Sequence, residues 1–599
     1  MKQADRAVSS QVSLLPYRRC IPQILVYQLV SKGIFTLVLF LYRQVTAFVL
    51  WNAGRPAMTS GDLPYMMASW EGWVLILCGF LLLVIYTVFD VNAAILMSDR
   101  LLRGKQIHVL PLLRDAFGAL GKFRNLWGVL AILYVSLAAP LTGAVFGITL
   151  TSNFVIPNFI TSVIRRTAIL NLLYTSGLIA LGIVGFLYVF TFDFAILGGE
   201  DVPEAMKSAK GVMKKNWKHF LLSYFLFLLK WLLVLAAGIT VIYALPCIFI
   251  EKITLSLTMR RAGIIFFSIL TAAFLAAFAV LATYYTQMKL TILYRAYSKK
   301  TAVAVAPKKT AYRKTITALV LAVLVFAVLI AAAGAEDFDK WYPAHGHAQV
   351  IAHRAGGNLA NENTVRGLNA AWENGAYGAE IDVQRTKDGY YIVNHDNTFK
   401  RTCGDSRAPG DMTLAEVKQL EVADRANLFG SPAEVATLED MLDAAKDRIR
   451  LYIELKGKSA DRQMAEDVIK EAEKRDMEEQ IVLISLDYEL IDYIEKKHPA
   501  IETGYLCYFA FGSIEKMNCD DLLMEEEVAT DSNIGKIHEA GKKAGVWTVN
   551  TSASMTGFLN SDVDFIITDE VTLAGRVRKL LGNRSDETRV LENWMRGIY

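Results

Sequence analysis

Residues 379–396 read AEIDVQRTKDGYYIVNHD, and this stretch favours one fold class for the polar half of the chain. An apolar run carries two acids two residues apart, Glu380 and Asp382, and a second apolar run leads directly into His395 and Asp396. Side chains two apart on a strand point to the same face, so the two acids are predicted to lie side by side. The stretch therefore predicts a buried strand with a polar site at its end.

Short apolar runs of this type alternate with helical patterns from residue 349 onward. About 250 residues of repeated strand and helix are the usual size of an α/β TIM barrel, (β/α)8. This domain is predicted at 335–581, with an insertion at 397–436 after the second strand unit, where glycine, proline and aspartate break the rhythm. A polar C-terminal tail at 582–599 has no clear role. Strands are predicted at 350–352, 379–383, 391–393, 451–453, 481–484, 504–506, 545–549 and 565–567.

The front part of the chain differs sharply in composition from this domain. Residues 1–334 carry 32 Lys and Arg against 11 Asp and Glu, whereas residues 335–599 carry 31 against 48. The chain is 599 residues long, with 53% hydrophobic and only 20% charged residues, which excludes a disordered protein. The polar half lacks a basic pattern, so no nucleic-acid partner is expected. Six cysteines without a CxxC pair indicate neither a disulfide framework nor a zinc site.

Seven apolar runs in residues 1–334 are long enough to cross a bilayer, which needs roughly 20 residues. The segments before span 1 and between spans 2 and 3, 4 and 5, and 6 and 7 hold 22 Lys and Arg, against 6 in the alternate segments. Positive charge stays on the cytoplasmic side, so the N-terminus is predicted inside the cell and the polar half outside. The spans of this all-α domain are predicted near 23–51, 73–97, 127–151, 168–199, 220–250, 262–294 and 316–334.

The predicted membrane domain holds a hint of internal repetition. Asp90 and Asp193 each follow a phenylalanine and precede Ala-Ile-Leu within four residues, and each motif continues into a basic stretch and a tryptophan near the next span. Acids inside a membrane are functional hypotheses by default. Both acids are predicted near the cytoplasmic ends of their spans, within reach of water. A structural role is therefore favoured, and a path for a substrate or ion stays open.

The chemistry of the barrel is expected at the carboxyl ends of its strands, where the active sites of such barrels lie. The first strand ends in His353-Arg354, a later strand in Glu454-x-Lys456, and a late strand in Trp547. These residues and the acids and histidine of the opening stretch are expected at the mouth of the barrel, the end formed by the carboxyl ends of its strands. Together they are three carboxylates, two histidines, an arginine and a lysine.

This set of groups is typical of phosphoryl chemistry. Three carboxylates suit Ca²⁺ or Mg²⁺, which prefer hard oxygen ligands. A cation flanked by arginine and lysine holds a phosphoryl group and neutralises the charge that builds in its transition state. Two histidines supply an acid and a base near neutral pH. Each feature alone is more often a paired strand face, a local hydrogen bond or a salt bridge, and for Trp547 a pocket wall and barrel packing are equally open.

In order and spacing these residues resemble the glycerophosphodiester phosphodiesterase family over roughly residues 348–580. The front half is similar in layout to the multi-span membrane domain attached to some bacterial members. The resemblance implies a TIM barrel with an insertion after its second strand unit. It rests on His353-Arg354, Glu362-Asn363-Thr364, Glu380-x-Asp382-Val383, Thr386-x-Asp388-Gly389, His395-Asp396, Glu454-x-Lys456, Trp547-Thr548-Val549-Asn550 and Thr568-Asp569.

The resemblance also implies roles for single residues. His353 and His395 would act as the general acid and base pair. Arg354 and Lys456 would contact the phosphate, and Trp547 is the further candidate for substrate binding. The ligands of the divalent metal would be Glu380, Asp382 and Glu454.

Three positions depart from the family pattern. Ala355 stands where glycine usually follows His-Arg, and Asn361 stands where proline usually precedes Glu-Asn-Thr. Asn394 takes the place of the first histidine in the His-His-Asp often seen in the family. None of these changes removes a predicted functional group.

The resulting expectation is a multi-pass cell-membrane enzyme whose outward-facing domain hydrolyses a glycerol-phosphate diester to a glycerol phosphate and an alcohol. A seven-span anchor favours a lipid or lipid-linked substrate, so a lysophospholipid or a glycerol-phosphate polymer is expected alongside a simple glycerophosphodiester. A lysophospholipase D-type enzyme is the nearest alternative, and a transporter or receptor that only binds a phosphodiester is a more distant one. The sequence chooses neither between water attack and a cyclic intermediate nor between oligomeric states.

Overall fold

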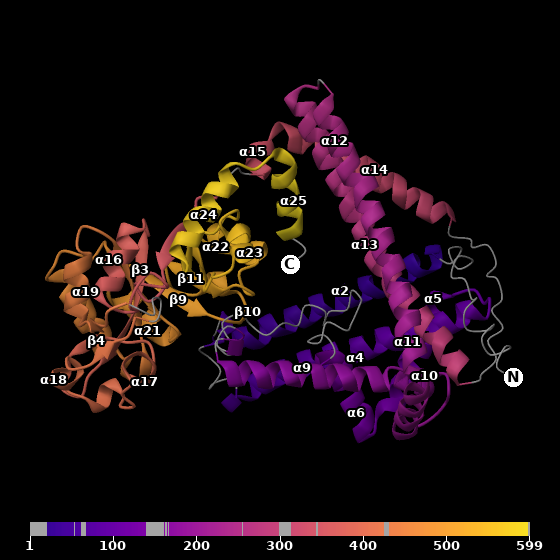
Figure 1. The fold of residues 1–599 in the computed structure, drawn as a ribbon, viewed down its shortest axis with the longest axis horizontal. Helices are drawn as coiled ribbons and strands as arrows, with labels where there is room; N and C mark the ends of the chain where they lie inside the picture. Colours follow the sequence, from indigo (N-terminus) through magenta and orange to yellow (C-terminus); the bar gives the residue numbers. More distant parts are fainter. Residues whose placement is uncertain are drawn as a thin grey trace.

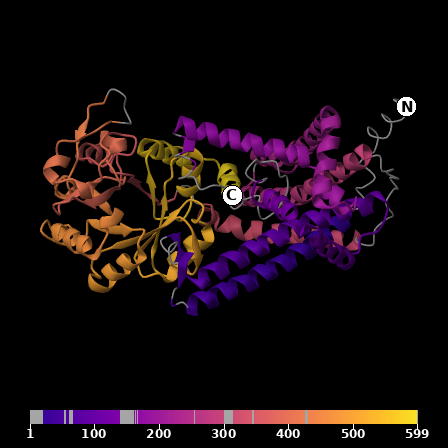
Figure 2. The same cartoon turned by 90° about the horizontal axis from the view of Figure 1, so that it is seen from below.

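The computed structural model describes residues 21–596, except 53, 55, 61–66, 139–160, 162–163, 166, 254, 299–312, 343–345 and 425–429. Two parts follow one another along the chain, a set of long helices and then an α/β barrel. Figure 1 shows the barrel at one end of the molecule and most of the long helices at the other, and Figure 2 shows the same division after a quarter turn.

Six helical segments of the described residues are long and apolar enough to cross a membrane. Their leucine, valine and phenylalanine side chains are largely exposed, and none of the residues of the third segment's main helix is buried. Only helices satisfy their own backbone hydrogen bonds while presenting such a surface to lipid. The segments consist of α2 (Ile21–Asn52), α4 (Trp70–Leu102), α9 (Ala168–Tyr188) with α10 (Thr191–Ile196), α11 (Val202–Ile239) with the π-helical turn η6 (Thr240–Ala244) and α12 (Leu245–Lys252), α13 (Leu257–Tyr297), and α14 (Arg313–Glu336).

The third predicted span, at 127–151, is only partly described. Helix α6 (Leu126–Leu133) and the π-helical turn η4 (Tyr134–Ala138) form its first part, and the rest lies outside the described residues. A count of seven spans therefore stays a prediction. Most of the basic segment before the last span, at 299–312, also lies outside the described residues. The remaining short elements of this part are α5 (Val109–Ala119), η3 (Leu120–Phe123) and α15 (Phe338–Trp341).

Eight parallel strands close the barrel, because the first strand pairs with both the second and the last. This confirms the predicted fold class. The strands are buried on both faces and read as nearly continuous apolar runs, as expected when helices cover the outside. In barrel order they are β2 (Gln349–Ala352), β3 (Gly378–Arg385), β7 (Arg450–Leu455), β8 (Ile481–Ser485), β9 (Thr503–Cys507), β11 (Asp521–Glu525), β12 (Lys543–Trp547) and β13 (Phe565–Thr568).

One barrel strand was not predicted, and one predicted strand lies outside the barrel ring. The sequence prediction omitted β11, because Asp521 and Glu525 at its ends leave only Leu-Leu-Met as an apolar run. The strand predicted at 391–393 exists as β4 (Tyr391–Val393), but it pairs antiparallel with the extended end of β3 and lies outside the barrel ring.

Amphipathic helices cover the outside of the barrel and bury their apolar faces in one cluster with the strands. The fifth unit has no α-helix among its described residues. Strand β10 (Ala510–Gly512) and the 3-10 turn η9 (Ile514–Lys516) follow its strand instead. The covering helices are α16 (Val365–Glu373), α19 (Leu438–Ala445), α20 (Arg462–Glu473), α21 (Tyr488–Lys497), α22 (Asp531–Glu539), α23 (Ser552–Phe558) and α24 (Val571–Gly582).

The insertion lies after the second barrel strand, as predicted. It has a small apolar core of its own, in which Phe399, Met412 and Val417 are fully buried. Its elements are α17 (Lys400–Cys403), η7 (Pro409–Asp411), α18 (Leu414–Val417), β5 (Glu421–Val422) and β6 (Ala433–Glu434).

Two contacts join the barrel to the helical part. In the first, β1 (Ala57–Thr59), which lies between α2 and α4, pairs antiparallel with β10. Leu50, Met58 and Leu75 form a small buried cluster beneath this pair, and Phe509 packs against it. The two-stranded sheet thus has an apolar support from both parts of the chain.

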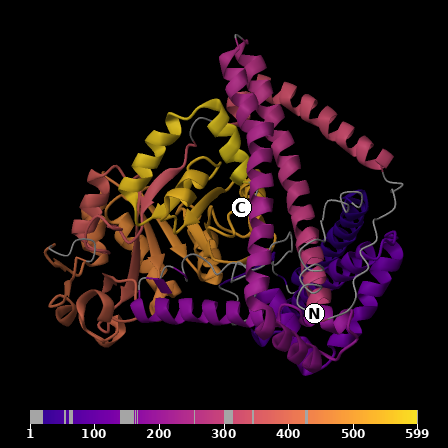
Figure 3. The same cartoon turned by 45° about the vertical axis from the view of Figure 1, so that its right-hand side comes forward.

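The second contact gives a structural role to residues 582–599, the polar C-terminal tail whose role is not clear from the sequence. Most of this segment forms α25 (Asp586–Arg596), which lies beside α13 (Figure 3). Arg260 and Arg261 at the start of α13 pair with Glu587 and Asp586 at 3.1 and 3.0 Å. The polar composition of the segment therefore reflects ion pairs with the helical part.

Asp521 is a buried acid at the amino end of β11, the end of the barrel opposite the catalytic mouth. Neither of its carboxylate oxygens has a hydrogen-bond partner in the described part of the chain. Burial, reinforced by Glu502, raises its pKa well above the usual value. In the unfolded chain the pKa of an aspartate is about 4, and in the folded protein that of Asp521 is higher. The folded protein therefore loses stability as the pH rises from the unfolded pKa to the folded pKa.

Asp521→Asn, which stays neutral at every pH, is therefore expected to stabilise the protein at pH 8 by about 1–2 kcal/mol. Melting curves of the purified protein at several pH values test this. The difference from the wild type should shrink as the pH falls to about 4.5, where the wild-type carboxyl is protonated. A difference that does not change with pH would contradict the assignment of a buried titrating acid.

Candidate active site

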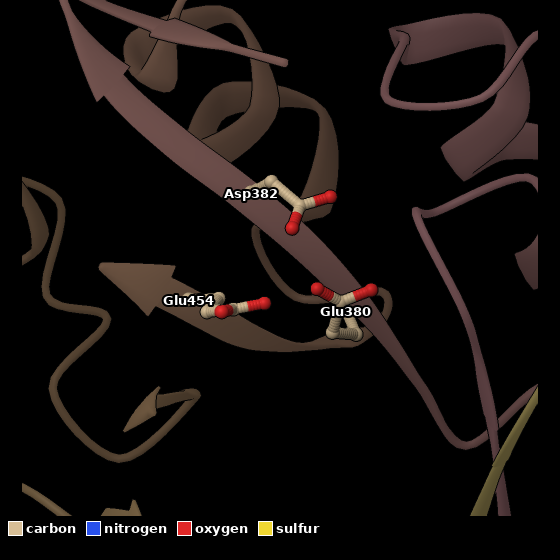
Figure 4. A group of neighbouring side chains, drawn as sticks. All are labelled: Glu380, Asp382 and Glu454. Carbon is tan, nitrogen blue, oxygen red and sulfur yellow. The ribbon is translucent and has the colours of Figure 1, made fainter. Parts of the chain in front are cut away.

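Three buried carboxylates stand on two neighbouring strands near the carboxyl end of the barrel (Figure 4). Glu380 and Asp382 lie on β3, and Glu454 on β7 is the register partner of Asp382. One oxygen atom of each carboxylate lies within 4.8 Å of those of the other two. The barrel thus brings the three predicted metal ligands together.

The protein alone does not keep all three acids charged. Burial, together with Asp382 and Glu454, raises the pKa of Glu380 well above its usual value. Burial also raises the pKa of Glu454 to about 7. For Asp382, burial opposes the charge but nearby Lys456 outweighs it, so the pKa lies well below the usual value. The site therefore gathers more acidic groups than its own cations neutralise.

Lys456 and Arg354 lie at the same mouth, as predicted. The Nζ atom of Lys456 lies 3.0 Å from Oδ1 of Asp382 and 2.9 Å from Oε2 of Glu454. The guanidinium of Arg354 pairs with Glu362 at 3.2 Å. Its Nε is buried and has no hydrogen-bond partner in the described residues, which leaves a donor for an anion.

His353, directly after β2, is held by a carboxylate. Its Nδ1 donates to Oδ1 of Asp569 at 2.7 Å, and Nδ2 of Asn550 donates to the other oxygen of Asp569 at 2.8 Å. This arrangement fixes the tautomer of the ring and leaves Nε2 facing the acids, 4.0 Å from Oε2 of Glu380. The sequence analysis gave Asp569 and Asn550 no role, although both stand at strand ends, which was the available signal.

His395 has an acidic partner of its own. Its Nδ1 donates to Oδ1 of Asp396 at 2.8 Å. The guanidinium of Arg401 lies 2.7 Å from Oδ2 of Asp396 and 2.5 Å from Oε2 of Glu362. Glu362 in turn pairs with Arg354, so Arg401 connects the partner of His395 to Arg354. Burial lowers the pKa of His395 below its usual value, which favours the neutral ring near pH 7. Sequence reasoning missed Arg401, which lies on α17 in the insertion, because no motif spacing pointed to it.

The loop after β2 has an unusual backbone. Arg354 and Ala355 adopt the left-handed conformation, with φ of 53° and 59°. As a result, the N–H of Arg354 donates to Oε2 of Glu380 at 2.7 Å, and the N–H of Ala355 donates to the main-chain oxygen of Glu380 at 2.6 Å. A left-handed residue other than glycine costs about 1–2 kcal/mol, so the loop stores strain in placing Glu380.

Ala355→Gly is expected to stabilise the protein by up to about 1 kcal/mol, because glycine adopts the left-handed conformation freely. The loss of one buried methyl group, worth about 0.8 kcal/mol, offsets part of this gain. Thermal unfolding of the variant and the wild type side by side measures the difference. An unchanged or lower melting temperature would show that packing of the methyl group outweighs the backbone strain.

Asn361 and Asn394, two of the departures from the family pattern, are buried and have structural partners. The side chain of Asn361 donates to the main-chain oxygens of Val422 and Ser431 at 2.8 and 3.2 Å, which ties the turn before Glu362 to the insertion. Asn394 donates to the main-chain oxygen of Asp396 at 2.6 Å. A proline at 361 has no donor for this tie, so the asparagine anchors the insertion beside the site.

Trp547 ends β12 and is half-buried. Its indole N–H donates to the main-chain oxygen of Leu523 at 3.0 Å, and its ring packs against the cluster inside the barrel. The structure thus gives Trp547 a packing role, and its contact with substrate stays a prediction.

A divalent cation fits the three acids at the mouth. Their oxygens are hard ligands, and two of the three carboxylates tend toward the protonated form in the absence of further positive charge. A doubly charged ion supplies that charge. The donor set alone does not distinguish Ca²⁺ from Mg²⁺, since both take carboxylate oxygens.

Two protein families match this chain, each over a different part of it. A family described as the membrane domain of glycerophosphoryl diester phosphodiesterase matches residues 17–330, and the glycerophosphoryl diester phosphodiesterase family matches residues 353–573. A glycerophosphodiester phosphodiesterase of Caldanaerobacter subterraneus is 32% identical over 240 residues, which is 38% of this chain and 98% of that protein.

Two further relatives match a similar share of the chain. A glycerophosphodiester phosphodiesterase of Bacillus subtilis is 25% identical over 256 residues, covering 38% of this chain and 86% of that protein. The crystal structure of a glycerophosphodiester phosphodiesterase from Thermotoga maritima has 26% identity and a TM-score of 0.33, covering 39% of this chain and 99% of that one. The membrane-domain match spans more than half of the 599 residues. The chain therefore belongs to the glycerophosphodiester phosphodiesterases that carry a membrane domain, and it is a phosphoric diester hydrolase.

Proposed function

We propose that this chain is a metal-dependent phosphodiesterase that acts at the outer face of the cell membrane. Its substrates are lipid-attached glycerophosphodiesters such as lysophospholipids. The products are a glycerol phosphate, free or acylated, and an alcohol. The observation that carries the proposal is the position of β10, which lies in a loop at the catalytic end of the barrel and pairs with β1 of the membrane domain.

The residues at the mouth divide the chemistry among them. Arg354 and Lys456 bind the phosphate, and His353 and His395 move protons. One histidine takes the proton of the attacking hydroxyl, which belongs to water or to the glycerol of the substrate, and the other gives a proton to the leaving alcohol. A Ca²⁺ or Mg²⁺ ion, held by the three acids on β3 and β7, neutralises charge on the phosphoryl group when bound.

The contact between β10 and the membrane domain supports a substrate that comes from the lipid. In a TIM barrel the loops after the strands surround the active site, and β10 lies in the loop after β9. Its pairing with β1 runs from Ala57 opposite Gly512 to Thr59 opposite Ala510. In addition, the N–H of Tyr508 donates to Oγ of Ser60 at 3.1 Å. The rim of the mouth is therefore attached to the loop that joins two spans.

The same contacts support a proposal for the side of the membrane. Strand β10 touches the loop after α2, helix α25, which follows the barrel, touches the start of α13, and the barrel itself follows the end of α14. These are the helix ends opposite the basic segments, which hold 22 of the 28 loop lysines and arginines. Because positive charge stays in the cytoplasm, this arrangement favours a barrel outside the cell and a cytoplasmic N-terminus.

Breaking the β1–β10 contact tests the lipid substrate. Met58 is the fully buried middle residue of β1, so Met58→Asp should separate the two strands, whereas Met67→Asp changes an exposed residue between β1 and α4. We expect Met58→Asp to lower kcat/KM for lysophospholipid in vesicles at least tenfold and to leave that for glycerophosphocholine in solution within about twofold. Met67→Asp should change neither.

The outcomes separate the parts of the proposal. An equal loss on both substrates in Met58→Asp would mean that the contact only supports the barrel. A wild-type protein that prefers a soluble diester would contradict a lipid substrate. A wild-type protein that cleaves poly(glycerol phosphate) faster than lysophospholipid would indicate that the polymer is the substrate instead. Hydrolysis of none of the three would contradict the enzyme assignment itself.

A further inference from the structure

A cavity of about 640 Å³ lies inside the membrane domain, lined by α4, α6, α9, α10, α11 and α13. None of the described residues that line it belongs to the barrel, and Figure 1 shows α6 and α10 at the end of the molecule away from the barrel, so this cavity is separate from the catalytic mouth. Its size is that of pockets for organic ligands and far exceeds a single ion.

Two acids from distant parts of the sequence meet at this cavity. Asp90 of α4 and Asp193 of α10 both line it. They are the two acids of the repeated Phe-Asp motif, so the repeat brings matched positions to one site. Asp90 is 7% exposed and Asp193 is 1% exposed. Buried acids within a membrane domain are costly unless a partner or a ligand compensates them.

Polar atoms at the cavity lack partners. Oδ1 of Asp90 and Oγ1 of Thr191 are buried, line the cavity and have no hydrogen-bond partner in the described residues. Oδ1 of Asp193 accepts from the hydroxyl of Thr291 at 3.2 Å. An unmade hydrogen bond at a buried polar atom costs about 1–3 kcal/mol, which a bound polar group relieves.

Of the two acids at the cavity, the described residues provide an ion-pair partner for only one. Lys32 lies 3.6 Å from Oδ2 of Asp90 and serves as its counter-charge. No lysine, arginine or histidine of the described residues lies within 4.0 Å of Asp193 in an ion pair. A ligand with one positive charge therefore balances the site.

Most of the rest of the wall is apolar and rich in aromatic rings, and Thr283, Thr286 and Gln287 of α13 add polar side chains. Such rings attract a cation that lies over their faces, most of all a quaternary ammonium group. A lining of this kind also accepts an alkyl chain. The aromatic residues of the wall are Trp127, Tyr134, Phe186, Tyr188, Phe192, Phe220 and Tyr224.

We infer that this cavity binds an amphiphile that carries a single ammonium group, with the ammonium at Asp193 and the alkyl chain along the aromatic wall. The unpartnered oxygen of Asp90 and the hydroxyl of Thr191 give the head group additional hydrogen-bond partners. The site is distinct from the barrel, and the inference does not depend on which diester the barrel cleaves.

Photolabelling of the full-length protein in phosphatidylglycerol nanodiscs tests the site. The probe is a dodecyl trimethylammonium with a diazirine in its chain, which contains no phosphate and is no substrate for the barrel. An uncharged dodecyl alcohol with the same diazirine is the control without the charge. Labelling of the exposed helix α2, which does not line the cavity, corrects each probe for its partition into the anionic lipid. We expect the ammonium probe to label peptides of α6 and α11 at least tenfold more than the alcohol, and unlabelled dodecyl trimethylammonium should compete.

Variants assign the labelling to the acid. Asp193→Asn keeps the shape of the side chain and should reduce the specific labelling at least tenfold, whereas Asp115→Asn, a partly exposed acid on α5, should not. Hydrolysis of a soluble diester at the wild-type rate shows that each variant is folded. Equal labelling by the charged and the uncharged probe in the wild-type protein, or full labelling of Asp193→Asn, would overturn the inference. If Asp193→Asn does not fold, the comparison of the two probes on the wild-type protein still decides.

Discussion

Glu380→Gln is expected to lower kcat/KM for a soluble glycerophosphodiester by a factor of about 10³ or more. The amide keeps the size of the side chain but removes one of the three carboxylates within 4.8 Å of one another. A bound cation contributes several kcal/mol to the stabilisation of a phosphoryl transition state, and each 1.36 kcal/mol is a factor of ten in rate. Steady-state hydrolysis with Ca²⁺, with Mg²⁺ and with a chelator measures the loss.

Metal binding gives a second readout that does not depend on turnover. A ligand that binds only the folded state raises its melting temperature, so added cation should stabilise the wild-type protein and not Glu380→Gln. Asp521→Asn is a matched control, because it removes a buried strand acid at the other end of the same barrel. It should keep both the activity and the cation-induced shift. Full activity of the wild-type protein in chelator would contradict a metal-dependent enzyme.

The barrel itself was predictable because its signal is spread over many residues. Runs such as Ile481–Ser485 are apolar on both faces, and helices with one apolar face follow them at regular distances. The error at Asp521–Glu525 has the same cause, since acids at both ends of a five-residue strand hide its apolar centre. One missed strand did not change the fold class, because the remaining units set the rhythm.

The candidate site was predictable wherever its residues stand at strand ends. Glu380, Asp382 and Glu454 meet as expected from strand geometry and barrel closure. Arg401 was not predictable, because the path of the insertion that carries it back to Asp396 depends on tertiary packing.

The contacts between the two parts of the chain could not be predicted from the sequence either. A three-residue strand such as Ala57–Thr59 has too few residues to show a period of two, and its partner Ala510–Gly512 is equally short. In the sequence, the acids of the C-terminal segment indicate a solvent-exposed tail. The structure shows that two of them form ion pairs with Arg260 and Arg261. Pairings between distant short segments leave no local pattern, so only the structure finds them.

His353→Ala and His395→Ala are each expected to lower hydrolysis of an alkyl glycerophosphodiester by about 10²–10⁴-fold, the usual contribution of a general acid or base. Both rings stand at the mouth with Nδ1 held by an aspartate, at 2.7 Å from Asp569 and 2.8 Å from Asp396. His538→Ala is the matched control, because that histidine pairs with Asp564 away from the site and its loss should leave activity unchanged.

The leaving group distinguishes the two roles. An alkoxide needs a proton as it departs, whereas p-nitrophenolate leaves without one. The variant that lacks the general acid should therefore recover most of its activity on a p-nitrophenyl diester, and the variant that lacks the base should stay impaired on both substrates. Equal losses on both substrates in both variants would contradict a division into one acid and one base.

The aspartates extend this test to the geometry of the site. A carboxylate at Nδ1 fixes the tautomer and stabilises the imidazolium, so its replacement impairs the ring that it holds. Asp569→Asn should then show the same leaving-group pattern as His353→Ala, and Asp396→Asn that of His395→Ala, each with a smaller loss. Because Asp396 also pairs with Arg401 at 2.7 Å, its variant should in addition raise KM through the link to Glu362 and Arg354. A KM effect in Asp396→Asn without one in Asp569→Asn would separate phosphate binding from proton transfer at a single mouth.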